Sequence, residues 1–291
     1  MFSAHLVDDA GRVLRATHPP RDNPTGIEDV SLLTRLVGWV GGVGVDTEKT
    51  EPLTDGVVLG PLRREGREIT IAGVAVLDTP AQAWALERHI SGMLAGGMGV
   101  LETSQEDDTG SVHSLSAAVQ LDGTIKVDTF VEPQPVVEWE IPLIAPDPCL
   151  YGRPRPHTLP MTSEGVGLKF PWFAPVDAGF MAFGTPAHQP PLLVNNGNAP
   201  AWPVYEVRGD LPQGFTIEQA GRTVSFGEAV FAASPVTVDM AGRVLVAGVD
   251  RTSAATVREW ASIPPGGTVA PALTVPAGVA SAQVTVRDTW M

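Results

Sequence analysis

The sequence predicts a mostly β protein of two domains, an N-terminal β-sandwich with one α-helix and a C-terminal β-sandwich. The first observation is the alternation of apolar and polar residues over Val136–Ile144, which is the pattern of a half-buried strand. The second is the distribution of 31 glycines and 27 prolines, which follow no period and are typical of a turn-rich β protein. The third is that apolar residues recur convincingly at helical spacing in one place alone, after Thr79.

The stretch Val136–Gly152 closes the first domain. Four apolar side chains share one face of its strand: Val137, Trp139, Ile141 and Leu143. Pro142 falls on the polar face, which predicts an edge strand or a strand near its end, because proline donates no ladder hydrogen bond. Pro146 and Pro148 then fix two φ angles, so we expect the chain to turn out of the sheet.

Charge divides the chain at the same place. The 291 residues carry a formal net charge of −14; residues 1–152 hold 10 basic and 23 acidic side chains, whereas residues 153–291 hold 9 and 10. We therefore expect one domain at 1–152 and another at 153–291, with an irregular linker at 153–191. An acidic domain argues against specific nucleic-acid binding, which depends on basic groups, although acidic charge can also serve solubility alone.

Four segments before the helix are assigned from their residue patterns. Phe2–Leu14 is predicted to be a hairpin that turns at Gly11. Val30–Val37 fits either a short strand or one helical turn. Gly38–Val45 alternates small and apolar residues, which predicts a glycine-rich strand, and Ile69–Leu77 is apolar enough to be a buried strand.

The helix is predicted to follow Thr79. Thr79 is a good N-cap, Pro80 suits the first helical position, and Gln82 completes a capping box. Gly96 and Gly97 are expected to end the helix. One apolar stripe at helical spacing is expected to pack against a sheet: Leu86, Ile90, Met93 and Leu94.

Turn residues organise the remaining strands. Asp122-Gly123 is the strongest hairpin signal and is expected to join strands at Leu115–Leu121 and Thr124–Val131. The acidic loop Glu106–Gly110 fits a solvated turn better than a calcium loop, because it lacks the alternating oxygen ligands of an EF-hand. Short strands beyond the linker predict the second β-sandwich: Leu192–Val194, Ala201–Val207, Phe215–Ile217, Thr223–Phe226, Val236–Met240, Arg243–Ala247, Thr256–Trp260 and Ala282–Arg287.

The sequence carries no motif for catalysis, a cofactor or a metal. It has no Gly-x-Ser-x-Gly elbow and no phosphate loop, and its six histidines never pair at a spacing of three or four residues. Cys149, the single cysteine, is expected to be a small packed residue rather than a nucleophile. Glu138 and Glu140 fit the separation of an inverting glycosidase pair, but a solvated strand face explains them as well. We expect no enzyme.

A resemblance to a known family rests on Pro142–Gly152, which reads Pro-Leu-Ile-Ala-Pro-Asp-Pro-Cys-Leu-Tyr-Gly. This stretch resembles the end of the N-terminal domain in siphophage distal tail proteins (Dit), and is most similar to minor tail proteins of actinobacteriophages. The likeness continues through the early hairpin, the glycine-rich segment and the helix. In the second half it covers Asn195–Gly209, Trp260–Gly267 and a strand ending at Trp290.

The resemblance implies a structural virion protein at the tail tip. The family's N-terminal domains form a ring, usually a hexamer, and its C-terminal domain is a galectin-like β-sandwich that points outward. The implied partners are other copies of the chain, the tail tube protein and the tail-tip hub, with the tape measure protein as a further neighbour. DNA passes through the ring without being bound specifically. No membrane insertion is expected, and synthesis is expected in the cytoplasm of the host bacterium.

Two sets of residues are candidates for that role. Acidic residues of the first domain are hypothesised to line the ring opening, where a negative wall would repel DNA phosphates: Asp46, Glu48, Glu51 and Asp55. Aromatic residues of the linker are expected to contact a neighbouring subunit or another tail protein: Phe170, Trp172, Phe173, Phe180 and Phe183.

Two other functions remain open. A carbohydrate-binding adhesion module would need an exposed aromatic platform on the second domain. Trp202 and Trp260 are its candidates, but both lie in or beside predicted strands and we expect them in the core. A hydrolase of the host surface would lose turnover when a single carboxylate is changed.

Overall fold

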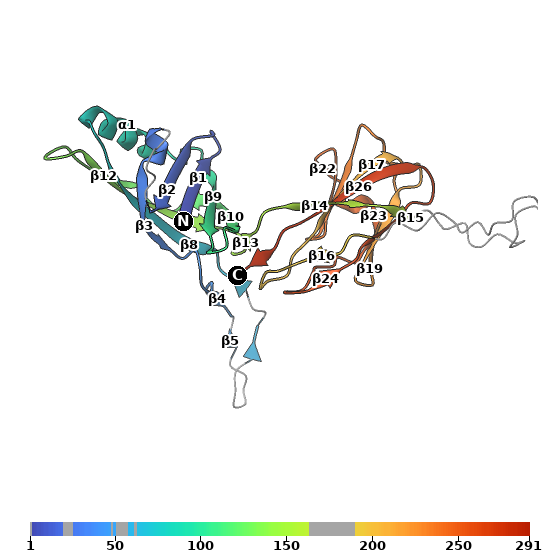
Figure 1. The fold of residues 1–291 in the computed structure, drawn as a ribbon. Helices are drawn as coiled ribbons and strands as arrows, with labels where there is room; N and C mark the ends of the chain where they lie inside the picture. The colour runs from blue at the N-terminus through green and yellow to red at the C-terminus, as the bar shows by residue number, and fades with distance from the viewer. Residues whose placement is uncertain (1, 20–25, 48, 51–57, 61–62, 163–189) are drawn as a thin grey trace, which may run out of the picture. The chain divides into compact units, whose positions relative to one another are not determined.

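The computed structural model describes residues 2–19, 26–47, 49–50, 58–60, 63–162 and 190–291, with the backbone alone at 49, 50, 58, 59, 161 and 162 (Figure 1). These residues are mostly in β-strands, and one α-helix occurs among them. The chain forms two compact units. The first comprises Met1–Arg153 together with Trp290–Met291, and the second comprises Pro154–Thr289.

The first unit holds one helix, one short 3-10 helix and a large sheet. The helices are η1 (Ile27–Asp29) and α1 (Pro80–Ser91). The strands are β1 (Phe2–Asp8), β2 (Val13–His18), β3 (Ser31–Val37), β4 (Val45–Asp46), β5 (Lys49–Thr50), β6 (Val58–Leu59), β7 (Arg63–Arg64), β8 (Arg67–Val76), β9 (Met98–Glu106), β10 (Val112–Leu121), β11 (Lys126–Phe130), β12 (Val136–Ala145), β13 (Leu150–Tyr151) and β27 (Thr289–Trp290).

The large sheet closes on itself. Its strand order runs β11-β12-β8-β3-β2-β1-β9-β10-β13-β27, and β10 also pairs with β12. The second pairing joins Gln120 to Ile144 and Leu121 to Leu143. The strands from β12 through β8, β3, β2, β1 and β9 to β10 therefore form a closed barrel, and closure leaves none of them as a free edge within it.

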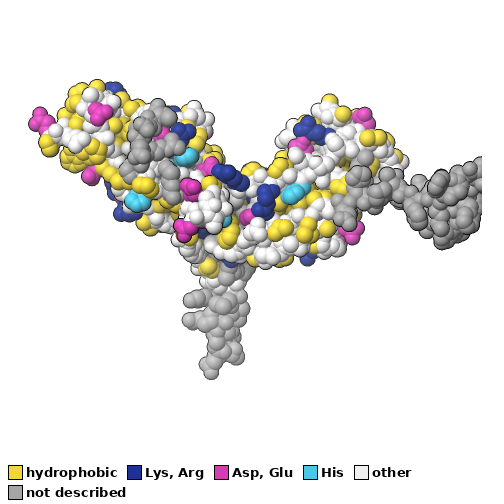
Figure 2. Space-filling model, viewed as in Figure 1, with side chains coloured by type: hydrophobic (Ala, Val, Ile, Leu, Met, Phe, Trp, Pro, Cys, Tyr) yellow, Lys and Arg dark blue, Asp and Glu magenta, His cyan; other side chains and the backbone are white. Residues whose placement is uncertain are grey.

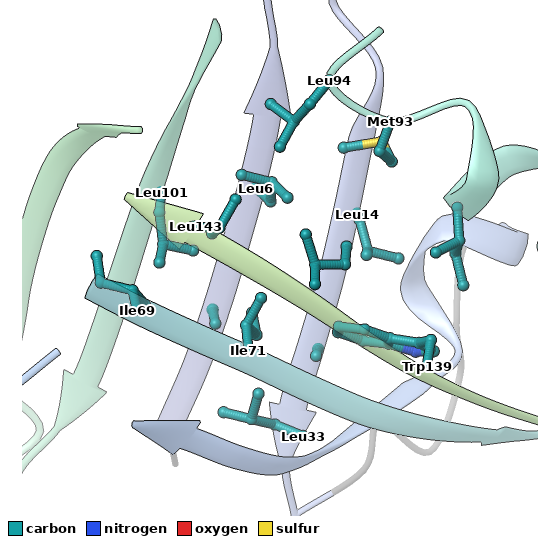
Figure 3. Packing of buried hydrophobic residues seen from close by; sticks show 14 of the residues in the cluster. Leu6, Leu14, Leu33, Ile69, Ile71, Met93, Leu94, Leu101, Trp139 and Leu143 are labelled. Atoms are coloured by element: carbon teal, nitrogen blue, oxygen red, sulfur yellow. The ribbon is translucent and has the colours of Figure 1, made fainter. Parts of the chain in front are cut away.

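The barrel interior is filled by alternate side chains of its strands. Leu6, Leu14, Leu101 and Leu143 point toward one another from four strands, and Ile69 and Ile71 of β8 face them (Figure 3). Trp139 lies flat in this core and donates a hydrogen bond from Nε1 to Ser31 Oγ at 3.2 Å. Gly73 leaves room for that ring, because a Cβ there would lie 2.5 Å from Trp139 Cζ2. The predicted inward face of Val137, Trp139, Ile141 and Leu143 is confirmed, since all four are buried.

Helix α1 begins as predicted. Thr79 Oγ1 accepts a hydrogen bond from Gln82 N at 3.3 Å, and Gln82 Oε1 accepts one from Thr79 N at 3.1 Å, which completes the capping box. The predicted stripe is buried in the same core as the barrel interior: Leu86, Ile90, Met93 and Leu94. The predicted end of the helix is wrong by about a turn, because the helix stops at Ser91 and Gly92 is its C-cap.

The glycine-rich strand predicted at Gly38–Val45 is wrong. Residues 38–44 form bends and loop, and pairing begins only at β4, where Val45 lies opposite Arg64 of β7. Gly38 has a φ of 78° and Gly41 a φ of 118°, which suit turns, and Gly38 also permits a close backbone approach, because a Cβ there would lie 1.9 Å from Glu68 O of β8.

The hairpin predicted at Asp122-Gly123 is also wrong. Strand β11 does not reverse onto β10; both pair antiparallel with β12, so the chain keeps its direction across Asp122-Gly123. Gly123, with a φ of 105°, therefore lies at a break between two strands that run in the same direction. Barrel closure overrides the local turn preference at this point.

Pro142 is not on an edge strand, so the first of its two expected positions is wrong, but it does lie in the last four residues of β12. Strand β12 is paired with β8 on one side and with β11 and β10 on the other. Strand β11 reaches β12 only as far as Glu140, and β10 begins to pair at Leu143, so Pro142 falls between them. Its carbonyl oxygen accepts a hydrogen bond from Asp122 N at 3.0 Å on this side. The missing N–H of proline therefore costs no ladder hydrogen bond.

Asp8 ties the first hairpin to the turn after α1. Its buried carboxylate accepts hydrogen bonds from Ala10 N at 3.0 Å, Arg12 N at 2.8 Å, Arg12 Nε at 2.9 Å and Leu94 N at 3.2 Å. Burial alone would raise the pKa of Asp8, but the hydrogen bonds and positive charge of Arg12 and the Leu94 N–H together hold the pKa below its usual value.

The Asp8→Asn variant is expected to lower the free energy of unfolding by about 1–3 kcal/mol at neutral pH. Because the folded pKa of Asp8 is depressed, its charge stabilises the fold above the unfolded pKa of about 3.9, and this stability is lost as pH falls through the folded pKa. The gap between variant and wild type should therefore close in acid. Urea unfolding between pH 7 and pH 2 checks this, with exposed Asp9→Asn as the control; a gap independent of pH contradicts it.

The second unit contains two sheets of short strands and a small third pair. Its strands are β14 (Arg155–Leu159), β15 (Met161–Thr162), β16 (Leu193–Val194), β17 (Val204–Asp210), β18 (Phe215–Gln219), β19 (Arg222–Phe226), β20 (Val236–Asp239), β21 (Arg243–Val246), β22 (Val249–Asp250), β23 (Ala255–Arg258), β24 (Thr268–Val269), β25 (Ala272–Thr274) and β26 (Val279–Val286), with η2 (Thr252–Ala254) before β23.

The two larger sheets share one apolar core. One sheet runs β14-β26-β17-β20-β21-β22 and the other runs β15-β25-β18-β19-β23. Phe215 and Phe226 from the second sheet stack with ring centroids 5.8 Å apart, and Tyr205 and Val284 from the first sheet are buried in the same cluster. The series of short strands predicted beyond the linker is thus confirmed as two facing sheets.

Candidate assembly surfaces and the hubs behind them

Arg67 forms a buried hub in the first unit, called here the arginine hub. Arg67 is only 3% exposed. Nε donates to Pro148 O at 3.0 Å, and Nη1 donates to Gly38 O at 3.1 Å, Trp39 O at 3.0 Å and Gly41 O at 3.1 Å. The hub therefore joins the loop after β3 to the proline-rich turn that ends the sheet.

The arginine hub has no carboxylate partner among the described residues. Burial lowers the pKa of Arg67, but an arginine keeps its charge at any ordinary pH. Carbonyl dipoles alone compensate the charge, which makes the geometry of residues 38–41 and of Pro148 dependent on this one side chain.

A β-hairpin arm extends the chain between β3 and β8. At its base β4 pairs with β7, where Asp46 lies opposite Arg63, and further out β5 pairs with β6. Asp46 is exposed on this arm. Of the four candidate channel residues, Glu48, Glu51 and Asp55 lie outside the described residues. The described base is of mixed charge because Arg63 and Arg64 are exposed beside Asp46.

The aromatic residues of the linker cannot be located, because all five candidates fall in 163–189, outside the described residues: Phe170, Trp172, Phe173, Phe180 and Phe183. Their proposed contact with a neighbour stays a prediction. The outside of the barrel carries two apolar rows that the sequence did not single out.

The first row crosses four neighbouring strands and is called the valine row. Val7 pairs with Val13 on one side and with Val100 on the other, and Val100 pairs with Ala118. Met98 is adjacent on β9 and is 53% exposed. These side chains point away from the barrel interior, because the buried residues of β1 are the alternate ones.

The second row crosses β11, β12 and β8 and is called the phenylalanine row. Val136 pairs with Phe130 on one side and with Val76 on the other. Phe130 is 52% exposed and Val76 56% exposed. A large aromatic and two valines thus form a small apolar surface on the outer face of the barrel.

Acidic side chains lie next to the phenylalanine row. Asp128 and Glu138 are directly opposite each other on β11 and β12, and both are exposed. They line a groove of about 410 Å³ with Lys126, Glu140 and the small residues Thr34 and Ala72. Like charges opposite each other on neighbouring strands destabilise a sheet.

Glu140 differs from its two acidic neighbours because its charge is compensated. It forms ion pairs with Arg35 and, at 2.9 Å, with Lys126 Nζ. The hydrogen bond from Lys126, more than any other contact, holds the pKa of Glu140 below its usual value. Asp128 and Glu138 have no ion-pair partner among the described residues. Glu138 and Glu140 are therefore side chains of a charged strand face, and the pairing of Glu140 with two cations does not suit a general acid or base.

The second unit is organised by Asn195, called here the asparagine hub. Asn195 is fully buried. Its Nδ2 donates to Ala199 O at 2.8 Å, Ile263 O at 3.2 Å and Pro264 O at 3.3 Å, and its Oδ1 accepts from Gly197 N at 3.0 Å and Thr289 N at 3.2 Å. The hub thus joins two stretches that carry the family resemblance, Asn195–Gly209 and Trp260–Gly267.

An ion pair lies beside the asparagine hub. Asp288 binds Arg155 through both oxygens, at 2.5 and 2.7 Å, and accepts from Asn196 N at 2.7 Å. Burial alone would raise the pKa of Asp288, but the contacts with Arg155 and Asn196 outweigh it and hold the pKa below its usual value. This bidentate pair fixes β14 against the residues that follow β26.

The structure also locates the remaining residues that the sequence singled out. Trp202 is exposed and not in the core, which corrects that expectation, whereas Trp260 packs partly buried against the core. Burial and the nearby Asp147 raise the pKa of Cys149 to about 11, so the thiol is protonated at neutral pH. Asp107 in the loop after β9 uses its carboxylate to hold the turn, at 2.8 Å from Thr109 N and 2.9 Å from Ser111 N.

The described residues hold neither a cluster of side chains suited to a metal ion nor a helix that could cross a membrane. No group of three or more histidine, cysteine, aspartate or glutamate side chains is placed to hold a metal ion. No helix in the described ranges is both long and apolar enough to cross a membrane. On the face visible in Figure 2, acidic, basic and apolar side chains are interspersed rather than gathered into a field of one sign.

The chain has a fold that is shared with phage hub and baseplate proteins of known structure. The Dit (gp 19.1) protein of phage SPP1, described as a paradigm of the hub adsorption apparatus in Gram-positive infecting phages, has the same fold: the TM-score is 0.60 at 11% identity, over 99% of both chains. A chain of the phage P2 baseplate in its activated conformation with calcium gives a TM-score of 0.51 at 9% identity, over 99% of this chain and 98% of that one. The resemblance drawn from the sequence is confirmed at the level of the fold. No protein-family model and no curated protein matches the chain.

Proposed function

We propose that this chain is a structural virion protein of a long-tailed phage that forms a ring in the distal tail. The ring joins the tail tube to the tip complex and surrounds the DNA exit channel. The observation that carries the proposal is that the likeness to the SPP1 hub protein extends over 99% of both chains, so both units and their order along the chain are shared.

The two units would divide the work. Residues 1–152 would form the ring, and residues 153–291 would form a galectin-like sandwich that points outward. Partners would be further copies of the chain, most simply six, with the tail tube and the tip hub. The role needs no catalysis and no cofactor, and it places the protein in the virion after synthesis in the host cytoplasm.

The channel hypothesis concerns the hairpin arm. Exposed Asp46, together with Glu48, Glu51 and Asp55, would present negative charge to the passing DNA. Because Arg63 and Arg64 offset the charge at the described base of the arm, the negative wall would have to come from the other three acids. A ring structure that places these acids on the outer circumference would contradict the hypothesis.

The ring proposal is tested by native mass measurement together with negative-stain imaging of the purified protein. A ring with a central opening is the expected result, with a mass that gives the copy number. A chain that remains monomeric, and that neither caps nor joins purified tail tubes, contradicts the proposal.

Carbohydrate binding is a second candidate, favoured by one observation: Trp202 is 43% exposed on the second unit. An exposed indole is a suitable stacking surface for a sugar ring. A glycan array with wild type and Trp202→Ala tests it. Binding that disappears in the variant supports an adhesion role, and the absence of any bound glycan contradicts it.

A further inference from the structure

We propose that the valine row of one copy packs against the phenylalanine row of a second copy, with Arg15 of the first placed against Asp128 and Glu138 of the second. This inference rests on the proposed ring and identifies the two flanks that would build it. The partner that packs against each row is therefore another copy of this chain.

The two rows lie on different strands of the barrel. The valine row lies on β2, β1, β9 and β10, and the phenylalanine row lies on β11, β12 and β8, so the two rows share no strand. A ring of identical subunits requires two different surfaces on opposite flanks of each subunit, because every contact is head-to-tail. An isologous dimer would instead use one surface twice.

A charged row accompanies each apolar row at the same spacing. The charged row beside the valine row lies two residues further along each strand. In it, Arg15 lies opposite His5, and His5 lies opposite Glu102. Next to the phenylalanine row, again two residues along, lie Asp128 and Glu138. The offset between apolar and charged side chains is therefore equal on the two flanks.

The direction of the offset also agrees. Strand β12 is antiparallel to β8, β8 to β3 and β2 to β1, while β2 and β3 are parallel, so β1 and β12 run in opposite directions. The step from Val7 to His5 goes against β1, and the step from Val136 to Glu138 goes along β12. Both charged rows thus lie on the same side of their apolar rows. A rotation about a ring axis along the barrel would keep each charged row on that same side of its apolar row.

Arg15 is opposite in sign to Asp128 and Glu138, whereas Glu102 of the same row shares their sign. Asp128 and Glu138 repel each other, and no cation among the described residues pairs with them, although Lys126 and Arg35 pair with Glu140 nearby. Arg15 forms no ion pair with any described residue. The groove of about 410 Å³ beside the two acids gives an arginine side chain room to enter. Aromatic, methionine and arginine side chains are also those enriched at protein interfaces.

The test is thiol cross-linking between two different single-cysteine variants. Val7→Cys and Phe130→Cys are each made in the Cys149→Ser background, and a short bis-maleimide is added to each alone and to their mixture. The expected result is a covalent dimer in the mixture, with neither variant alone giving more than background. Val249→Cys, which is 65% exposed in the second unit, is the matched control partner for Val7→Cys.

Charge reversal supplies the second readout. Arg15→Glu in the Val7→Cys chain is expected to lower the cross-linked yield about tenfold, which corresponds to roughly 1.4 kcal/mol. The combined changes Asp128→Lys and Glu138→Lys in the Phe130→Cys chain are expected to restore it. Circular dichroism spectra unchanged from wild type show that each variant has folded.

The outcomes separate this inference from the proposed function. Rings with the mixed cross-link and with rescue by charge exchange support both. Rings without that cross-link, or with strong Val7–Val7 dimers, overturn the assignment of the flanks and leave the ring standing. Absence of self-association, with monomeric mass and no cross-link, overturns the ring and this interface together.

Discussion

Replacing Arg67 with methionine is expected to lower the free energy of unfolding of the first unit by roughly 3–5 kcal/mol. Methionine has a similar length and fills the space, but it donates nothing to Pro148 O or to the three carbonyls of Gly38, Trp39 and Gly41. Buried carbonyls without donors carry the full desolvation penalty. Denaturant unfolding followed by tryptophan fluorescence gives the magnitude.

Two controls make the Arg67 prediction specific. Arg64→Met, at an exposed position on β7, is expected to change stability by less than about 0.5 kcal/mol. Arg67→Lys keeps the charge but not the planar set of donors, so it should fall between methionine and wild type. Hydrogen exchange should show the loss of protection at residues 38–41 and 145–148 first. Equal stability of Arg67→Met and wild type would contradict the hub.

The Asn195→Asp variant is expected to destabilise the second unit by about 3 kcal/mol or more at neutral pH. The exchange is nearly isosteric, but the Nδ2 group that donates to Ala199 O, Ile263 O and Pro264 O becomes a carboxylate oxygen. Three carbonyl oxygens then face a buried negative charge without a proton between them.

The pH dependence of Asn195→Asp follows from the same contacts. Burial and facing carbonyls favour the neutral acid, so the folded pKa of the new carboxyl is raised above its unfolded value of about 3.9. The destabilisation caused by the variant is therefore smallest below about pH 3.9, and it grows as the pH rises through the folded pKa of the new carboxyl. Thermal unfolding between pH 3 and pH 8 checks the trend, with the exposed Asn198→Asp as control. A loss that does not change with pH contradicts the account.

Local patterns were enough to predict the elements whose structure is decided locally. The capping box at Thr79 and the alternation of Val137, Trp139, Ile141 and Leu143 were both correct, because each depends on residues a few positions apart. The Asp122-Gly123 hairpin failed for the opposite reason. Its outcome was decided by β12, which recruits both β10 and β11, and no local signal reports such pairing.

The candidate surfaces were beyond sequence reasoning for a related reason. Val7, Val100 and Val136 each look like ordinary strand residues, and only the register across neighbouring strands shows that exposed apolar side chains line up. Arg67 gave no signal either, since one arginine before an apolar strand is common. Asn195 did lie in a stretch noted for family resemblance, but three of its five hydrogen bonds join it to Ile263, Pro264 and Thr289, which are far away in the chain.

The return of the chain to the first unit at Trp290 has a thermodynamic consequence. Because the second unit is an insertion between Arg153 and Trp290, a folded first unit holds both of its ends. When the sandwich unfolds in that setting, it becomes a closed loop rather than a free tail and gains less entropy. Removing Trp290 and Met291, which abolishes the second attachment, should therefore lower the melting temperature of the sandwich.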